Sequence, residues 1–272
     1  MRTGTQSSAD ADLAYAAAQV VVRTHERLAE YVRAGRTLAE IDARVGAVLR
    51  QLGVRSCFLG YKPSGMPPFP NHACLSVNNC VVHGMSNTLS RPLEHGDLFK
   101  LDIGVWHKGF VGDAAWTYSI GPAEPRARAL MDAGKESLRR GVEQLRPGNT
   151  YAHWAQAVQS YVEGERGFRL VRGLGGHGIG RSLHGPPYVS NVLPSYPGEW
   201  PDAQTPCAPG TLVAVEPMLA ETTGEVRHAR RSWPIFTADG SLSVHYEHDV
   251  LITRDGPRVL SEGMERLPDE LG

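Results

Sequence analysis

Residues 99–115 read FKLDIGVWHKGFVGDAA, in which two apolar runs meet at Lys108-Gly109. Two such runs joined by a polar residue and a glycine are typical of a β-hairpin with a two-residue turn. With the turn at these two residues, Gly104 faces Asp113. Because side chains alternate between the two faces of a strand, Asp102 and Asp113 then share one face as diagonal neighbours, with Cα atoms about 7–8 Å apart.

The spacing of these two aspartates suits carboxylates that bind a pair of metal ions roughly 3.5–4 Å apart. Gly104 and Ala115 lie on the same face and are small, which leaves room for such a centre. The alternative is a hairpin whose aspartates face the solvent. Aspartate is disfavoured inside strands, and both aspartates have apolar neighbours. The sequence therefore favours a metal site over a solvated face.

Helical segments occur in two similar pairs, one on each side of the hairpin. Helices are expected over residues 13–31, with a cap at Ser8 or Asp10, over 38–52, from about 125, and over 151–163. Gly35 and Thr37 separate the first pair, and Gly148 and Thr150 separate the second. Glycine commonly follows a helix and threonine commonly begins one, so coincidence is the alternative. Because a helix is also expected on each side of both segments, we expect an ancient internal duplication.

Short runs rich in β-branched and aromatic residues follow each helical pair. The clearest are Cys74–Val82, Leu98–Val105, Gly109–Ser119, Leu212–Ala220 and Ser243–Thr253. Helices and strands that alternate in blocks predict an α+β fold with an antiparallel sheet. Two proline-rich segments, Tyr61–Pro70 and Gly185–Gly210, are expected to be loops. The second loop is long enough to suggest a functional role.

Two glutamates lie inside apolar, strand-like runs: Glu216 in VAVEPM and Glu247 in VHYEHDV. A buried carboxylate is costly unless it is paired or binds a metal ion. For each run taken alone, the alternative is a surface strand with one polar face.

Three histidines stand out because glycine follows them or surrounds them. The stretch 173–184 reads GLGGHGIGRSLH and presents His177 and His184 around a tight turn. It formally matches a dinucleotide-binding pattern, but that pattern requires a long helix, which Gly180 and the prolines after it would block. His83 ends an apolar run in VVHG and, taken alone, fits a surface residue better.

Read together, the acidic residues and His177 make a set of four carboxylates and one imidazole. This set is too rich in oxygen for a structural zinc site. It suits manganese, iron, cobalt or zinc in a two-metal hydrolytic site. The chain has no G-x-S-x-G motif, which argues against a serine hydrolase of that type.

The bulk properties are those of a globular chain of 272 residues, 41% hydrophobic and 21% charged. A net charge of -1 gives no electrostatic footprint for nucleic acid or an anionic membrane. The four cysteines form no C-x-x-C pair, which favours reduced thiols in a cytosolic protein. Asp10 and Asp12 precede the apolar start of the first helix and have the wrong sign for a signal peptide.

On these motifs, from about residue 13 to 253, the sequence resembles type I methionine aminopeptidases of the creatinase-like, pita-bread fold. The resemblance rests on one ordered set of residues: Asp102, Asp113, His177, Glu216 and Glu247. The run Val82-His83-Gly84 narrows the resemblance from the whole superfamily to the methionine aminopeptidases. The resemblance implies an antiparallel sheet backed by two pairs of helices with internal pseudo-two-fold symmetry. We expect a tail at 1–12 and one catalytic domain at 13–272, with pseudo-halves at about 13–122 and 123–260.

The resemblance also implies roles for the five ligands at a centre of two divalent ions (Co, Mn, Fe or Zn). Asp102 would bind one metal ion, and His177 and Glu216 would bind the other. Asp113 and Glu247 would bridge both ions. A water held between the ions would attack the first peptide bond, and Glu216 would also handle its proton.

Substrate contacts are implied in the same way. His184 would stabilise the oxyanion, and His83 would hydrogen-bond the substrate amide nitrogen and help protonate the leaving amine. The residues implied for the methionine pocket are Phe69, Cys74 and Trp233, with Leu183, Cys57 and Tyr61 as further candidates. Several departures from the family pattern touch the substrate pocket, among them an insertion at Lys62–Pro68 and His245 where glutamine is frequent.

The implied substrates are N-terminal Met-peptides and nascent polypeptides, with the ribosome as a candidate place of action. A cytoplasmic monomer that binds neither a specific nucleic acid nor a membrane is expected. Two alternatives stay open: a related peptidase of X-Pro specificity, and a non-catalytic binding protein on the same scaffold. His83 and the short N-terminus argue against the first, and the five intact ligands argue against the second.

Overall fold

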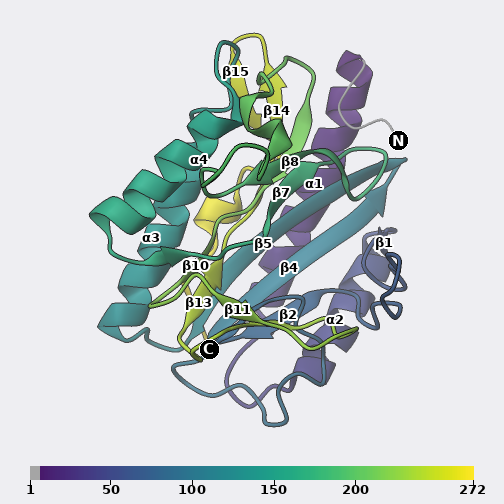
Figure 1. Cartoon of the computed structure of the whole chain (residues 1–272). Helices are drawn as coiled ribbons and strands as arrows, with labels where there is room; N and C mark the ends of the chain where they lie inside the picture. Colours follow the sequence, from purple (N-terminus) through teal and green to yellow (C-terminus); the bar gives the residue numbers. More distant parts are fainter. Residues whose placement is uncertain (1–6) are drawn as a thin grey trace.

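Two long antiparallel strands, β4 (Leu98–His107) and β5 (Phe110–Ile120), form the centre of the computed structural model, which describes residues 7–272 (Figure 1). Lys108 and Gly109 connect them with φ angles of 49° and 84°. Positive φ at both positions is the geometry of the favoured two-residue hairpin turn. In this register Gly104 pairs with Asp113, so the predicted hairpin is confirmed.

The described residues form two five-stranded sheets, one of which contains this hairpin, and two three-stranded sheets. The first large sheet adds β1 (Arg55–Ser56), β2 (Cys74–Val77) and β16 (Glu270–Leu271) to the hairpin. The second has the order β15 (Gly256–Val259), β14 (His248–Thr253), β9 (Leu212–Val215), β7 (Gly175–Gly178) and β8 (Gly185–Ser190). One small sheet has the order β13 (Ser243–His245), β10 (Met218–Ala220) and β6 (Arg169–Leu170). The other has the order β11 (Val226–Arg227), β12 (Ile235–Thr237) and β3 (Cys80–Val82).

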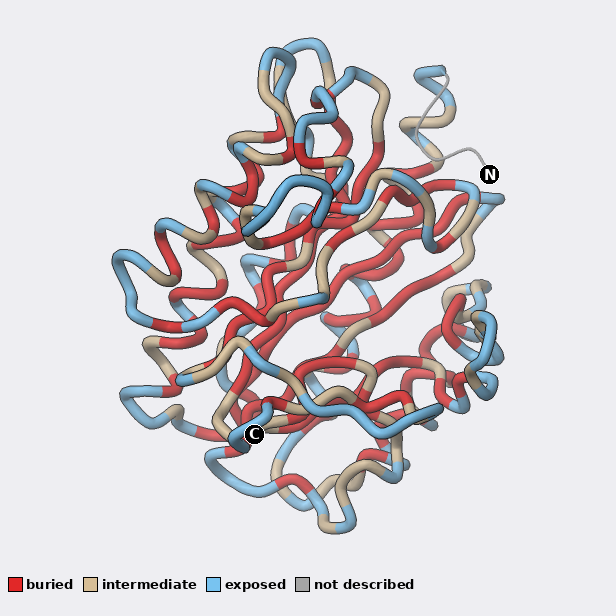
Figure 2. The backbone as a smooth tube through the Cα atoms, viewed as in Figure 1, coloured by how far each residue is buried: buried red, intermediate tan, exposed pale blue. Residues whose placement is uncertain are grey.

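Among residues 7–272, four α-helices pack against these strands, as the α+β prediction requires. They are α1 (Ser8–Ala29), α2 (Leu38–Gln51), α3 (Pro125–Val142) and α4 (Tyr151–Gln159), the last continued by a π-helical segment (Ser160–Glu165). Helix α1 packs against β4 and β5, whereas α3 packs against α4, β10 and β13. The central strands are buried, while the outer turns of α3 and α4 are exposed (Figure 2). None of the helices among residues 7–272 is both long and apolar enough to cross a bilayer.

The two helix pairs begin their second helices in the same way. Thr37 and Thr150 are the N-caps of α2 and α4, and each forms a capping box with the residue three positions later. Gly35 and Gly148 both have positive φ, at 85° and 94°. This repeated construction supports the predicted duplication.

Helix α1 begins earlier than predicted. The Asp10 backbone N–H donates to Ser7 Oγ at 3.1 Å, and this N-cap starts the helix at Ser8. Residues 8–12, expected to be in a tail, are therefore helical. The rest of that tail, residues 1–6, lies outside the described residues.

Three of the predicted strands are each divided into two, and this is the main difference from the sequence-based expectation. Residues 74–82 form β2 and β3, 212–220 form β9 and β10, and 243–253 form β13 and β14. In each case the chain leaves one sheet and joins another. The loop expected at Gly185–Gly210 was also partly wrong, because it begins with β8. Strand β8 is at the edge of its sheet, where proline is tolerated.

A small apolar cluster, separate from the main core, positions the region described next. It includes Phe58, Phe69, Leu183 and Trp233, together with residues of α1 and β5. All four cysteines are buried and form no disulfide.

Candidate metal centre

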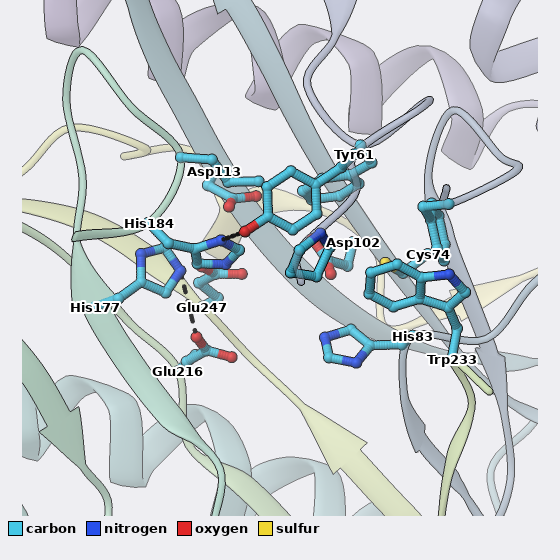
Figure 3. Close-up of a pocket in the computed structure, with 14 residues that line it drawn as sticks. Tyr61, Cys74, His83, Asp102, Asp113, His177, His184, Glu216, Trp233 and Glu247 are labelled. Carbon is cyan, nitrogen blue, oxygen red and sulfur yellow. Dashed lines mark hydrogen bonds and ion pairs between the residues drawn. The ribbon is translucent and has the colours of Figure 1, made fainter. Parts of the chain in front are cut away.

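A cavity of about 240 Å³ lies between the two large sheets (Figure 3). Acidic residues and histidines line one part of it, and apolar and aromatic residues line the other. The lining residues are Phe58, Tyr61, Pro63, Phe69, Cys74, His83, Asp102, Asp113, His177, Leu183, His184, Glu216, Trp233 and Glu247. The structure therefore brings together every predicted metal ligand, both further predicted histidines, and Phe69, Cys74 and Trp233.

The two glutamates enter the cavity at breaks between strands. Glu216 lies between β9 and β10, and Glu247 lies between β13 and β14. Since β9 pairs with β14 and β10 pairs with β13, the two breaks face each other where the chain passes between sheets. The Glu247 backbone N–H also donates to Ala115 O at 2.9 Å, which ties this glutamate to β5.

The two aspartates come from adjacent strands of the hairpin. Asp113 is buried, and its backbone N–H donates to Asp249 Oδ2 at 2.9 Å. Asp102 pairs with Cys74 of β2 on the other side of β4. One carboxylate oxygen of each aspartate is buried and has no hydrogen-bond partner among the described residues. Such oxygens are available to an ion.

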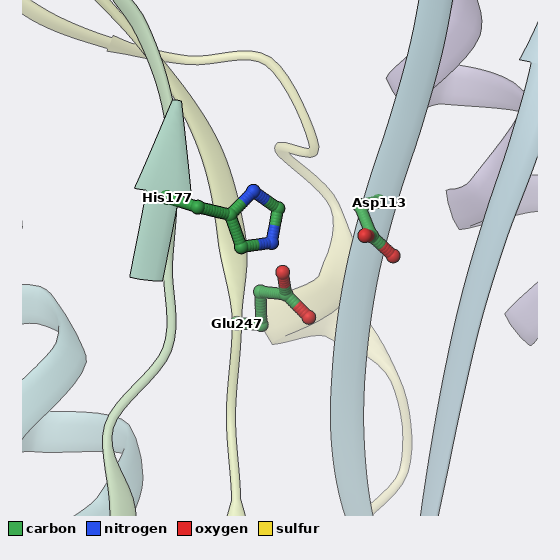
Figure 4. Close-up of side chains that lie close together, drawn as sticks. All are labelled: Asp113, His177 and Glu247. Carbon is green, nitrogen blue, oxygen red and sulfur yellow. The ribbon is translucent and has the colours of Figure 1, made fainter. Parts of the chain in front are cut away.

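Glycines allow the backbone around His177 to pass unusually close to its neighbours. A Cβ on Gly176 would lie 2.2 Å from Ala214 O, and one on Gly178 would lie 2.0 Å from Pro186 O. The glycine-rich sequence therefore lets β7 fit between β8 and β9. In this position the donor atoms of His177, Asp113 and Glu247 lie within 4.8 Å of one another (Figure 4).

Burial changes the protonation of this cluster. Desolvation raises the pKa of Asp102 to about 7 and that of Glu216 to about 8. It also raises the pKa values of Asp113 and Glu247 well above the ordinary range, and the neighbouring carboxylates raise them further. Burial lowers the pKa of His177 to about 3, so its imidazole is neutral and free to act as a ligand. Four crowded carboxyl groups beside a neutral imidazole fit a site that divalent cations complete.

His245 belongs to this cluster, although sequence reasoning noted it only as a departure from the family pattern. Its buried Nε2 atom lies 3.2 Å from Glu216 Oε2 and 4.0 Å from Glu247 Oε2. The three residues form a second group whose donor atoms lie within 4.8 Å of one another. Strand alternation was the available signal, because residues 245, 247 and 249 have the same parity.

The histidines and aromatic residues complete the cavity. The ring of His83 meets that of Trp233 edge-on, with centroids 6.0 Å apart, so His83 is not the surface residue that its segment alone suggested. The rings of His184 and His177 are 4.3 Å apart. Cys57, a further candidate for the methionine pocket, does not line the cavity but lies behind Gly104. Phe58, which was not predicted, lines it instead, as does Pro63 of the Lys62–Pro68 insertion.

The family follows from comparison with known proteins. The sequence model of metallopeptidase family M24 matches residues 12–254. The chain belongs to this family. Among curated relatives of this M24 metallopeptidase, methionine aminopeptidase 1 of Bacillus subtilis is 33% identical over 90% of the chain and 93% of the relative. A methionine aminopeptidase of Clostridium perfringens is 35% identical over 92% and 95%, respectively.

Comparison with solved structures supports the same family assignment. The M24 metallopeptidase superposes on a methionine aminopeptidase of Thermotoga maritima with a TM-score of 0.85 and 28% identity, covering 96% of this chain and 99% of the other. An Xaa-Pro dipeptidase of Bacillus anthracis, at 20% identity and a TM-score of 0.73, shares the fold. The superposition covers 98% of this chain but 63% of the dipeptidase. The predicted pita-bread fold is confirmed.

Proposed function

We propose that this M24 metallopeptidase is a methionine aminopeptidase that removes the initiator methionine from proteins with a small second residue. One observation carries the proposal: the five candidate metal ligands and two further histidines line the same cavity as apolar and aromatic side chains. Curated methionine aminopeptidases align with about 90% of the chain, which supports the same activity.

The proposed ligands divide between two ions. Asp102 would hold one ion, His177 and Glu216 would hold the other, and Asp113 and Glu247 would contribute to both. The donor set of carboxylates and one or more imidazoles suits cobalt, manganese, iron or zinc. When bound, two such ions would lower the pKa of water and polarise the carbonyl group of the substrate.

The protein side chains supply the remaining steps. Glu216 would accept the proton of the attacking water, since its carboxyl group lines the cavity 3.7 Å from His177 Nε2. His184 donates an N–H to the oxyanion that develops on the scissile carbonyl. His83 hydrogen-bonds the substrate amide nitrogen and helps protonate the departing amine.

The apolar part of the cavity fits the methionine side chain. The rings of Phe69 and Trp233 meet edge-on with centroids 5.2 Å apart, and Cys74 and Leu183 line the same space. A thioether packs favourably against aromatic ring edges. The aromatic walls therefore favour methionine over a charged or β-branched first residue.

We further propose that the substrates are nascent polypeptides in the cytoplasm, met at the ribosome, and that the enzyme acts as a monomer. The domain proposal is a single catalytic domain over 13–272 with two related halves. The matching caps at Thr37 and Thr150 support the relation between the halves.

Mass spectrometry of peptides incubated with the enzyme and Co²⁺ or Mn²⁺ tests the activity. We expect methionine to be released from a Met-Ala peptide and more slowly from a Met-Leu peptide, while an X-Pro peptide stays intact. Cleavage of the X-Pro peptide alone would show the other peptidase specificity. Metal-loaded protein that cleaves none of the peptides would show a binding protein.

A further inference from the structure

The phenol of Tyr61 reaches the edge of the metal centre and bonds to a histidine there. Tyr61 Oη lies 2.8 Å from Nδ1 of His184, and the two ring centroids are 5.3 Å apart (Figure 3). The His177 ring meets the same imidazole edge-on, with centroids 4.3 Å apart and planes at 69°. The His184 ring is therefore held between a hydrogen bond and a ring contact.

The backbone around Tyr61 is fixed by the inserted loop that follows it. The Phe69 N–H donates to Tyr61 O at 2.9 Å, and the Tyr61 N–H donates to Phe58 O at 2.8 Å. Across the loop, Trp233 Nε1–H donates to Pro67 O at 3.1 Å. These bonds close the loop at both its base and its far side, so the phenol is aimed at His184 from a constrained position.

The hydrogen bond has a direction that follows from its two groups. A tyrosine hydroxyl has an ordinary pKa of about 10, and burial raises the pKa of Tyr61 further, so it keeps its proton at neutral pH. A neutral imidazole carries one proton, on one of its two nitrogens, and its other nitrogen accepts a hydrogen bond. Nδ1 of His184 is the acceptor that the described residues offer to the Tyr61 hydroxyl. The hydroxyl therefore donates to Nδ1, and the imidazole proton lies on Nε2.

We propose that Tyr61 is a positioning residue that holds His184 as the Nε2–H tautomer and keeps that N–H directed into the cavity. This inference rests on the proposed function, in which His184 donates to the oxyanion. An imidazole protonated on Nδ1 would present a lone pair to a developing negative charge, and its donor would be lost. Tyr61 thus acts through His184 and forms no bond to the reacting atoms.

The tautomer can be read directly, without turnover. Two-bond ¹H–¹⁵N correlation spectra of ¹⁵N-labelled, zinc-loaded protein distinguish a protonated imidazole nitrogen from a bare one. The His184→Ala variant identifies the His184 signals by their loss. We expect wild-type His184 to carry its proton on Nε2, and Tyr61→Phe to give a mixture of tautomers. A wild-type imidazole protonated on Nδ1, or an Nε2–H tautomer unchanged in Tyr61→Phe, overturns the inference.

Kinetics with a Met-Ala peptide give a second measurement. We expect Tyr61→Phe to lower kcat by about 10–100-fold, the loss typical for a residue that orients a group of a metal site, with zinc content and KM little changed. Tyr196→Phe, at an exposed tyrosine away from the cavity, is the matched control and keeps the wild-type kcat. The double variant of Tyr61→Phe and His184→Ala should be no slower than His184→Ala alone. A further loss in the double variant would mean that Tyr61 acts on the substrate itself and would overturn the inference.

The two proposals fail in different ways. Wild-type protein that leaves Met-Ala peptides intact removes the proposed function, while the spectra still decide the tautomer. Wild-type protein that is active, together with a Tyr61→Phe variant of equal kcat, removes the role of Tyr61 and leaves the aminopeptidase assignment standing.

Discussion

Gly104 lies directly opposite Asp113 in the central hairpin, and its missing side chain is what lets Cys57 and Phe58 approach β4. A Cβ at this position would lie 2.4 Å from Cys57 Sγ and 2.6 Å from Phe58 Cε1. Phe58 also lines the cavity. The hairpin that supplies two carboxylates therefore also sets the position of a wall of the substrate pocket.

The variant Gly104→Ala tests this relationship. Because overpacking typically costs about 1–3 kcal/mol, we expect the free energy of unfolding in urea to fall by that amount. Displacement of Phe58 should also raise KM for a Met-Ala peptide. Gly164→Ala, where an added Cβ meets no atom within 4 Å, is the control. Equal stability and KM in Gly104→Ala and the control would contradict the prediction.

The hairpin could be predicted because its information is local. The turn at Lys108-Gly109 and the strict alternation around it set the register within a few residues. The division of residues 212–220 into β9 and β10 could not be predicted, since it depends on pairing with strands that lie far away in the sequence. The run of apolar residues predicts one continuous strand, whereas the chain passes from one sheet to another at Glu216.

The candidate site divides in the same way. The five ligands could be found because each lies in a short, distinctive motif, and a buried acid in an apolar run needs an explanation. The bond between Tyr61 and His184 joins residues 123 positions apart. The approach of His245 to Glu216 likewise depends on side-chain directions across the break between strands. Alternation groups His245 with Glu247, but no local pattern predicts its approach to Glu216 or the bond between Tyr61 and His184.

The stability of the metal-free protein should depend on pH in an unusual direction. The pKa values of Asp102 and Glu216 are raised to about 7 and about 8, whereas unfolded carboxyl groups have values of about 4. Between these values the folded state binds more protons than the unfolded state, so the free energy of unfolding falls as pH rises. We expect the Tm of chelator-treated protein to decrease from pH 5 to pH 8.

Divalent ions should remove this dependence, because they stabilise the charged carboxylates. Protein loaded with Mn²⁺ and scanned over the same pH range is the control. A chelator-treated protein whose Tm is constant or increases between pH 5 and pH 8 would argue against the crowded, buried carboxyl groups described above.

His245 should affect metal binding through Glu216. Groups that orient a metal-binding carboxylate typically contribute about 10–100-fold to metal affinity, so we expect His245→Leu to weaken Mn²⁺ binding by that factor in titration calorimetry. His245→Gln retains a polar group of similar reach beside Glu216 and should keep most of the affinity. If His245→Leu binds Mn²⁺ as tightly as the wild type, the contact with Glu216 has no role in holding the ion.

Neutralising one ligand should separate folding from chemistry. We expect Asp102→Asn to abolish release of methionine, because its remaining oxygen and amide hold an ion poorly, while far-UV circular dichroism stays like that of the wild type. His177→Ala should behave in the same way. Full activity of either variant after chelation and metal replacement would remove these residues from the proposed centre.

Loss of the His184 imidazole should affect the rate rather than the metal content. Removing one oxyanion donor typically lowers kcat by about 10²–10³-fold, and His184 belongs to neither group of clustered metal-binding atoms among the described residues. We therefore expect His184→Ala to retain its ions, measured by atomic emission, while kcat for a Met-Ala peptide falls by that factor. A variant that loses an ion instead would make His184 a ligand. Unchanged kcat with full metal content would show that other groups stabilise the oxyanion. The Nε2–H group of His184, which Tyr61 is proposed to maintain, would then not contribute to catalysis.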